Sequence, residues 1–251
     1  MSASPPLVAV AHGSRDARSP ATVRALVEVV RASAPGVDVR VAFLDLADPP
    51  VSGVLRELHA EGHQEIVVVP LLLGSAYHAR VDLPALVEGV TRELPSLRVR
   101  VADVLGADPA LEAVARDRLA AADADLGDPR LGVVLSAVGS SDERANAAVE
   151  AMACRWQSAR PRHAPVVQAF AGAAKPDVPA AVARLRARGA RDIAVASWFL
   201  APGLLPDRIA EQVRRAAPEA RFAGPLADDP RVAEVVLRRY DWAQMTHAKT
   251  A

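Results

Sequence analysis

In this 251-residue chain, the side chains best suited to chemistry belong to two histidines and one aspartate. His12, Asp45 and His78 each come after a different apolar run rich in valine. Two imidazoles and a carboxylate form a reasonable ligand set for a borderline divalent ion such as iron(II), cobalt(II) or nickel(II). An imidazole can also accept a proton. We therefore predict that His12 and His78 bind a metal ion and that all three residues are catalytic.

The two halves of the chain repeat one pattern, but only the first half keeps its histidines. With a shift of 126 residues, His12-Gly13-Ser14 lies over Val138-Gly139-Ser140, and with a shift of 127, His78 falls on Leu205. A backbone pattern kept in both halves indicates the fold, whereas a polar group kept in one half indicates chemistry. The alternative is that each histidine is an ordinary loop residue bonded to the backbone, and the paired loss in the second half weighs against it.

Glycine-serine pairs follow the first and third apolar runs and lead into helical segments. Exposed backbone N–H groups at such helix starts attract anions, and nearby arginines add positive charge. This predicts a carboxylate-rich or phosphorylated ligand, with ordinary turn formation as the alternative. Asp82 is expected to cap the following helix. The predicted binding residues are Gly13, Ser14, Arg15, Gly74, Ser75 and Arg80.

A second histidine pair, His59 and His63, has the spacing of a zinc-binding helix. Gly62 lies between the two, however, and no glutamate follows His59 as in the zinc protease motif. A solvated helix end is the favoured interpretation.

Alternating strand and helix patterns must position these side chains. Valine- and isoleucine-rich runs predict strands at 7–11, 37–43, 66–70 and 97–103, and amphipathic stretches predict helices at 20–34, 51–61, 83–94 and 109–122. The second half repeats the order, with strands near 131–137, 165–170, 192–197 and 220–224. We expect an α/β fold of two lobes, residues 1–125 and 126–251, each a four-stranded parallel sheet with helices on both faces. A pseudo-twofold between them would leave a ligand cleft at the carboxyl ends of the strands.

The composition excludes several functional classes. The 30 basic and 30 acidic side chains cancel, so the basic excess typical of nucleic-acid or membrane-surface binding is missing. The single cysteine, Cys154, excludes an intramolecular disulfide and is expected to be buried in a helix. No P-loop or G-x-G-x-x-G motif supports nucleotide binding. With no signal peptide or membrane-spanning run, a cytoplasmic protein is expected, with a loose tail after Trp242.

Two of these motifs together resemble the class II, CbiX-type sirohydrochlorin chelatases. Residues 11–16 (AHGSRD) are similar to the N-terminal signature of that family, and residues 69–74 (VPLLLG), followed by His78 and by Asp82-Leu83-Pro84, are similar to its second signature. The resemblance covers both halves, as in the long, two-lobed members whose second lobe has lost its histidines.

The resemblance implies two flavodoxin-like lobes with a tetrapyrrole in the cleft and a metal-binding pair at His12 and His78. Asp45 stands where glutamate is more usual in the family and is one methylene shorter, which favours action through water over direct coordination. The implied activity is insertion of a divalent metal, ferrous iron being favoured, into sirohydrochlorin at the end of siroheme synthesis, without a nucleotide. The alternatives are cobalt insertion for cobalamin and a non-catalytic metal or tetrapyrrole carrier. A monomer or a homodimer is compatible with the sequence.

Overall fold

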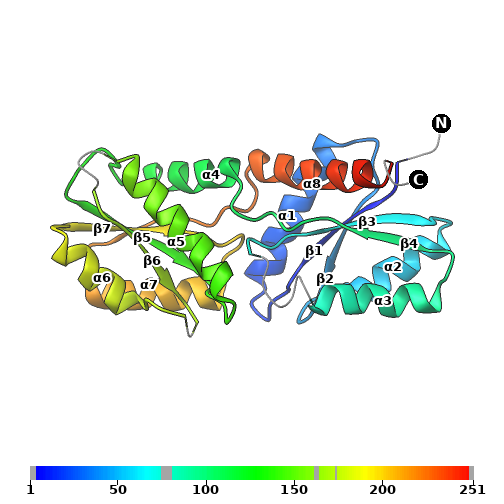
Figure 1. Ribbon diagram of the computed structural model, residues 1–251, viewed down its shortest axis with the longest axis horizontal. Coiled ribbons are helices and arrows are strands. Elements are labelled where there is room, and N and C mark those ends of the chain that lie inside the picture. Colours follow the sequence, from blue (N-terminus) through cyan, green and yellow to red (C-terminus); the bar gives the residue numbers. More distant parts are fainter. Residues whose placement is uncertain (1–3, 75–80, 161–163, 173, 249–251) are drawn as a thin grey trace. The chain divides into compact units, whose positions relative to one another are not determined.

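The computed structural model describes residues 4–74, 81–160, 164–172 and 174–248, which form two compact units (Figure 1). Each unit contains a four-stranded parallel sheet, with strand order β2-β1-β3-β4 in the first and β6-β5-β7-β8 in the second. The order is the same once the second set is renumbered, so the sequence repeat is a repeat of topology. This confirms the predicted α/β class with one parallel sheet in each half.

The elements of the first repeat follow the predicted positions closely. Its strands are β1 (Leu7–Ala11), β2 (Val39–Phe43), β3 (Glu65–Pro70) and β4 (Arg98–Val101), and its helices are α1 (Arg18–Ser33), α2 (Val51–Ala60), α3 (Leu83–Glu93) and α4 (Pro109–Ala120).

The second repeat has the same alternation of strands and helices. Its strands are β5 (Leu131–Ala137), β6 (Val166–Phe170), β7 (Asp192–Ser197) and β8 (Arg221–Phe222), and its helices are α5 (Glu143–Ser158), α6 (Val178–Ala187), α7 (Leu204–Ala216) and α8 (Pro230–Ala248).

The central strands are buried because helices cover both faces of each sheet. Every residue of β1 and β5 is buried, which explains why these strands are continuous apolar runs rather than alternating ones. In the first unit, α2 and α3 pack together on one face of the sheet, while α1 and α8 pack together on the other (Figure 1). The second unit has α6 and α7 on one face and α4 and α5 on the other. Because the strands of each sheet are parallel, their carboxyl ends all lie at one edge of that sheet.

The compact units exchange the last helix of each repeat, so they do not follow the predicted boundary between residues 125 and 126. The first unit comprises Met1–Asp108 and Ala227–Ala251, and the second comprises Pro109–Leu226. Helix α4 follows β4 but packs on β7, and α8 follows β8 but packs on α1 and β3. Both helices present apolar surface, and either sheet offers a face that needs covering, so sequence order alone does not fix which helix covers which sheet.

A buried carboxylate attaches α4 to the second unit. Glu112 is only 7% exposed, and its two oxygens accept hydrogen bonds from Arg155 Nη2 at 2.5 Å and from Trp156 Nε1 at 3.0 Å. The guanidinium of Arg116, also on α4, lies 5.5 Å from the Trp156 ring centroid. These contacts between α4 and α5 indicate that the exchanged helix is an integral part of the second unit.

We expect Glu112→Ala to lower the free energy of unfolding by about 2 kcal/mol, because it removes a charge-assisted hydrogen bond and leaves the buried indole N–H without its acceptor. Urea unfolding measures the change. Glu112→Gln keeps an acceptor oxygen and should cost clearly less. Equal losses in the two variants would show that packing, rather than hydrogen bonding, attaches α4.

Two local expectations from the sequence were wrong. Helix α8 continues past Trp242 to Ala248, so the segment predicted to be loose is helical through residue 248. Cys154 is exposed, because the buried side of α5 is formed by Met152, Ala153 and Trp156 and Cys154 lies off that stripe. Among the described residues, none of the helices combines the length and apolarity that crossing a membrane requires.

Candidate functional site at the carboxyl edge of the first sheet

His12 directly follows β1 at the carboxyl edge of the first sheet, as predicted. The side chain is half-buried, and its Nδ1 lies 3.2 Å from the carbonyl oxygen of Gly13. A carbonyl oxygen only accepts hydrogen bonds, so this contact favours the tautomer with its proton on Nδ1. The lone pair is then on Nε2, the nitrogen that can accept a proton or bind a metal ion.

The loop that carries Asp45 is bonded to the backbone of the His12 loop. The N–H of Asp45 donates to the carbonyl oxygen of His12 at 2.9 Å, and the N–H of Leu44 donates to that of Ala11 at the same distance. These bonds extend the β1–β2 pairing beyond the end of both strands. The structure therefore brings two of the three predicted catalytic residues together, with an exposed Asp45 beside a half-buried His12.

Gly13 is required by this close approach of two loops. Its φ is +94°, and a Cβ placed on it would lie 1.7 Å from the carbonyl oxygen of Asp45. Only glycine fits such a position, since any side chain would push the Asp45 loop away. The predicted binding residue Gly13 thus has a demonstrable steric role in forming the site.

Leu46, next to Asp45, holds an unusual backbone conformation. Its φ is +59°, its side chain is 43% exposed, and its N–H donates to Asp45 Oδ1 at 2.8 Å. A left-handed backbone costs a residue with a Cβ about 1–2 kcal/mol. Such strain concentrates at functional sites, which makes an exposed apolar side chain at this edge a candidate for ligand contact. The sequence contained no signal for this residue.

The start of α1 is less available to an anion than the sequence suggested. Ser14 Oγ accepts from the N–H of Asp16 at 3.1 Å, so Ser14 forms a turn. The Asp16 carboxylate in turn accepts from the N–H, Nε and Nη2 of Arg18, and these hydrogen bonds lower the pKa of Asp16. Arg15 is exposed and remains the predicted cation of this loop.

The segment after β3 holds the second half of the predicted site. The N–H of Leu71 donates to the carbonyl oxygen of Val10 at 2.7 Å, so β3 reaches the same edge beside β1, and Gly74 follows, exposed. Asp82 precedes α3 but makes no capping hydrogen bond, because its backbone is already helical. The remaining predicted residues, Ser75, His78 and Arg80, lie outside the described residues.

A different group of potential metal ligands lies at the opposite, amino edge of the first sheet. Asp38, Glu61 and His63 bring ligand atoms within 4.8 Å of one another. The guanidinium of Arg40 already bonds both carboxylates, at 2.7 Å to Asp38 and 2.9 Å to Glu61, and lowers the pKa of Asp38. A cation would have to compete with that arginine, so the arrangement favours an ion-pair network.

His59 belongs to the same edge as that ion-pair network. Its Nδ1 lies 3.2 Å from the carbonyl oxygen of His63 and its Nε2 lies 3.5 Å from Ser96 Oγ, both typical of a helix end. The interpretation of His59 and His63 as a solvated helix end thus agrees with the structure.

Comparison with known proteins finds relatives that match most of this chain. The CbiX family model matches residues 6–122 and 132–243, once for each repeat. The sirohydrochlorin ferrochelatase of Bacillus subtilis is 26% identical over 235 residues, which cover 92% of this chain and 88% of that protein. The sirohydrochlorin cobaltochelatase of Priestia megaterium is 24% identical over 239 residues, covering 92% of this chain and 77% of that protein.

Solved structures agree on the fold. SirB from Bacillus subtilis with Fe³⁺ superposes with a TM-score of 0.80 at 22% identity, covering 96% of this chain and 95% of that one. CbiX described as the terminal enzyme of siroheme biosynthesis in denitrifying bacteria gives a TM-score of 0.66 at 21% identity, covering 95% of this chain and 99% of the other. The match of the family model to both repeats shows that this chain belongs to the CbiX family.

Proposed function

We propose that this chain inserts a divalent metal ion, ferrous iron by preference, into sirohydrochlorin. The observation that carries the proposal is the position of His12, at the carboxyl edge of the sheet with Nδ1 directed to its own loop and Asp45 held alongside. Membership of the CbiX family and similarity over most of the chain to two sirohydrochlorin chelatases support it.

The reaction needs what these side chains offer. As the metal ion enters the macrocycle, two pyrrole N–H protons leave, so the products are the metallated macrocycle and two protons. Nε2 of His12 binds the incoming ion or accepts a departing proton, and the Asp45 carboxylate offsets the positive charge of the ion. His78 is proposed as the second imidazole on sequence grounds. Arg15 and Arg80 are proposed to attract the peripheral carboxylates of the substrate.

The iron preference is a separate part of the proposal, because affinity for nitrogen and oxygen ligands rises from iron(II) through cobalt(II) to nickel(II) and does not by itself favour iron. Cobalt insertion is the second candidate, favoured by the relative that is named a cobaltochelatase. The two activities would use the same residues.

Anaerobic mixing of the protein with metal-free sirohydrochlorin and either iron(II) or cobalt(II) tests the proposal, since the absorption spectrum changes when the macrocycle is metallated. We expect catalytic amounts of protein to accelerate insertion over the spontaneous rate, with the larger kcat/KM for iron. A larger value for cobalt would overturn the iron preference alone. Stoichiometric binding without acceleration would indicate a carrier and overturn the proposed activity.

We further propose that Leu46 contacts a face of the macrocycle. Leu46→Gly should then raise the free energy of unfolding by about 1 kcal/mol, since glycine tolerates φ of +59°, while it weakens sirohydrochlorin binding severalfold. Urea unfolding and an absorbance titration with metal-free sirohydrochlorin measure the two effects.

Asp123 supplies the control for Leu46→Gly. It also has a positive φ, +57°, but lies in the turn after α4. Asp123→Gly should leave the affinity for sirohydrochlorin unchanged. If Leu46→Gly binds sirohydrochlorin as tightly as the unmodified protein does, the Leu46 side chain does not contact the substrate and the proposal for this residue is wrong.

A further inference from the structure

Three backbone hydrogen bonds shape the loop of residues 44–48, which carries Asp45. The first two N–H groups of this loop donate to the end of β1 and to His12. The third bond closes the base of the loop, where the N–H of Phe43 donates to the carbonyl oxygen of Pro49 at 2.9 Å. All three bonds are made by backbone atoms, so they do not require an aspartate at position 45.

The second repeat forms the same three bonds without an acidic residue. The equivalent segment is residues 171–175, with the sequence AGAAK. Its first two N–H groups donate to the carbonyl oxygens of Ala137 and Val138, both at 3.0 Å, and the N–H of Phe170 donates to that of Pro176 at 3.1 Å. A pattern that both repeats keep is a feature of the fold.

A side chain of α1 makes a further contact with the Asp45 loop. The guanidinium carbon of Arg24 lies 5.3 Å from the centroid of the Phe43 ring, and its Nη2 donates to the carbonyl oxygen of Asp48 at 2.7 Å. Phe43 is only 1% exposed, so its ring is a firmly packed support for the guanidinium. Arg24 thus attaches the last residue of the loop to α1, while the first two residues are attached to β1 and His12.

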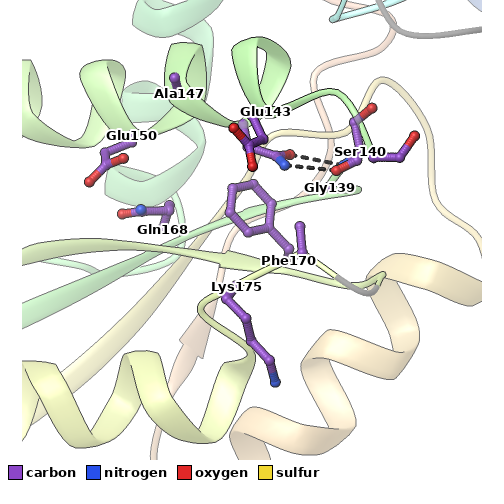
Figure 2. A pocket seen from close by; sticks show the side chains of 11 residues that line it. Gly139, Ser140, Glu143, Ala147, Glu150, Gln168, Phe170 and Lys175 are labelled. Atoms are coloured by element: carbon purple, nitrogen blue, oxygen red, sulfur yellow. Dashed lines mark hydrogen bonds between the residues drawn. The ribbon is translucent and has the colours of Figure 1, made fainter.

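Arg24 has an acidic counterpart in the second repeat. In both repeats the serine before the helix accepts a hydrogen bond from the N–H two residues later, which fixes the offset between α1 and α5 at 126 residues and gives Glu150 as the counterpart. A carboxylate has no hydrogen to donate to a carbonyl oxygen. An open cavity lined by Glu150, Phe170 and Lys175 lies at this position instead (Figure 2). The second repeat therefore makes its backbone bonds without such an arginine.

The arginine is thus dispensable for the backbone of the loop but occurs in the repeat that carries His12 and Asp45. Its guanidinium is engaged by Phe43 and Asp48, so it influences the site through the loop. The Asp45 carboxylate depends on that loop, because it is exposed and its Oδ1 accepts from the N–H of Leu46 at 2.8 Å. Fixing both ends of the loop therefore fixes the direction of the carboxylate.

We propose that Arg24 is a positioning residue, which holds the Asp45 carboxylate beside His12 by fixing Asp48. The inference rests on the proposed function only for its consequence, which is that a carboxylate held in place offsets the charge of the incoming metal ion. Without the arginine the loop opens more often, the bond from the Asp45 N–H to His12 breaks more often with it, and a metal ion is bound more weakly.

Amide hydrogen exchange of Asp45, followed by NMR on the full chain without metal or substrate, tests the positioning directly. We expect Arg24→Met, which keeps an apolar stem and removes the donor, to speed this exchange about two- to tenfold, the change in an opening equilibrium that one hydrogen bond produces. Arg24→Lys keeps a cationic donor and should restore most of the protection. Tm should fall by no more than about 4 °C in either variant, because the second repeat forms the same backbone bonds with a glutamate at this position.

Arg31, further along α1, supplies the matched control. Its Nε donates to the carbonyl oxygen of Val39, at the opposite end of β2, at 2.8 Å. Arg31→Met removes the same kind of bond and should leave the exchange of Asp45 unchanged. Unchanged exchange in Arg24→Met, or equal acceleration in Arg31→Met, would overturn the proposal.

Titration with cobalt(II) in the absence of macrocycle, read by the absorption of the ion, tests whether Arg24 acts through Asp45. Arg24→Met should weaken cobalt(II) binding severalfold in the otherwise unmodified chain and not at all in Asp45→Asn, where the carboxylate that the arginine positions is absent. Equal weakening in both backgrounds would overturn the proposal. Faster exchange in Arg24→Met, together with no acceleration of metal insertion by the unmodified chain, would overturn the proposed function alone, since exchange needs neither metal nor macrocycle.

Discussion

His12→Ala is expected to lower the rate of metal insertion into sirohydrochlorin at least about a hundredfold, to the spontaneous rate, because it removes the imidazole that we propose to bind the ion and accept a proton. Anaerobic absorbance assays under iron(II) and under cobalt(II) measure the loss. The same result is expected for His78→Ala from the sequence pattern. Both metals should be affected alike, since the lost group serves the macrocycle chemistry common to the two.

The fold should survive this substitution. His12 contributes its carbonyl oxygen, rather than its ring, to the hydrogen bond with Asp45, and alanine keeps that carbonyl. An unchanged Tm would therefore separate loss of chemistry from loss of structure. His59→Ala, at the amino edge of the same sheet, is the matched control and should retain full activity. Full activity in His12→Ala would refute the proposed function.

The strands were predictable because burial on both faces leaves a direct trace in the sequence. The run from Leu7 to Ala11 is wholly apolar, and it forms β1 at those residues. The position of His12 then followed from topology, since a residue directly after a parallel strand lies at the carboxyl edge. The pairing of Asp45 with this edge followed for the same reason.

The features that the sequence did not reveal depend on contacts between distant segments. The exchange of α4 and α8 is decided by which sheet face each helix covers, and hydrophobic periodicity is the same for either partner. The positive φ of Leu46 arises from the loop bonded to His12, and nothing about a leucine indicates it.

The second large effect concerns Gly13, the glycine beside the proposed catalytic residue His12. We expect Gly13→Ala to lower the free energy of unfolding by at least about 3 kcal/mol, measured by urea denaturation. Two costs combine: alanine is strained by a backbone φ of +94°, and its Cβ would lie 1.7 Å from the carbonyl oxygen of Asp45. The loop after β2 must move to relieve this contact, which breaks the bond from Asp45 to His12, so activity should fall as well.

Gly62→Ala separates the two costs, because Gly62 has nearly the same backbone, with φ of +99°, but nothing lies within 4 Å of the added Cβ. That variant should lose only the conformational part, about 1–2 kcal/mol, and keep its activity. The difference between the two losses is then the free energy that holds the Asp45 loop against the His12 loop. Equal losses would mean that the Asp45 loop yields at no cost, and a site that depends on its fixed position beside His12 could not be maintained.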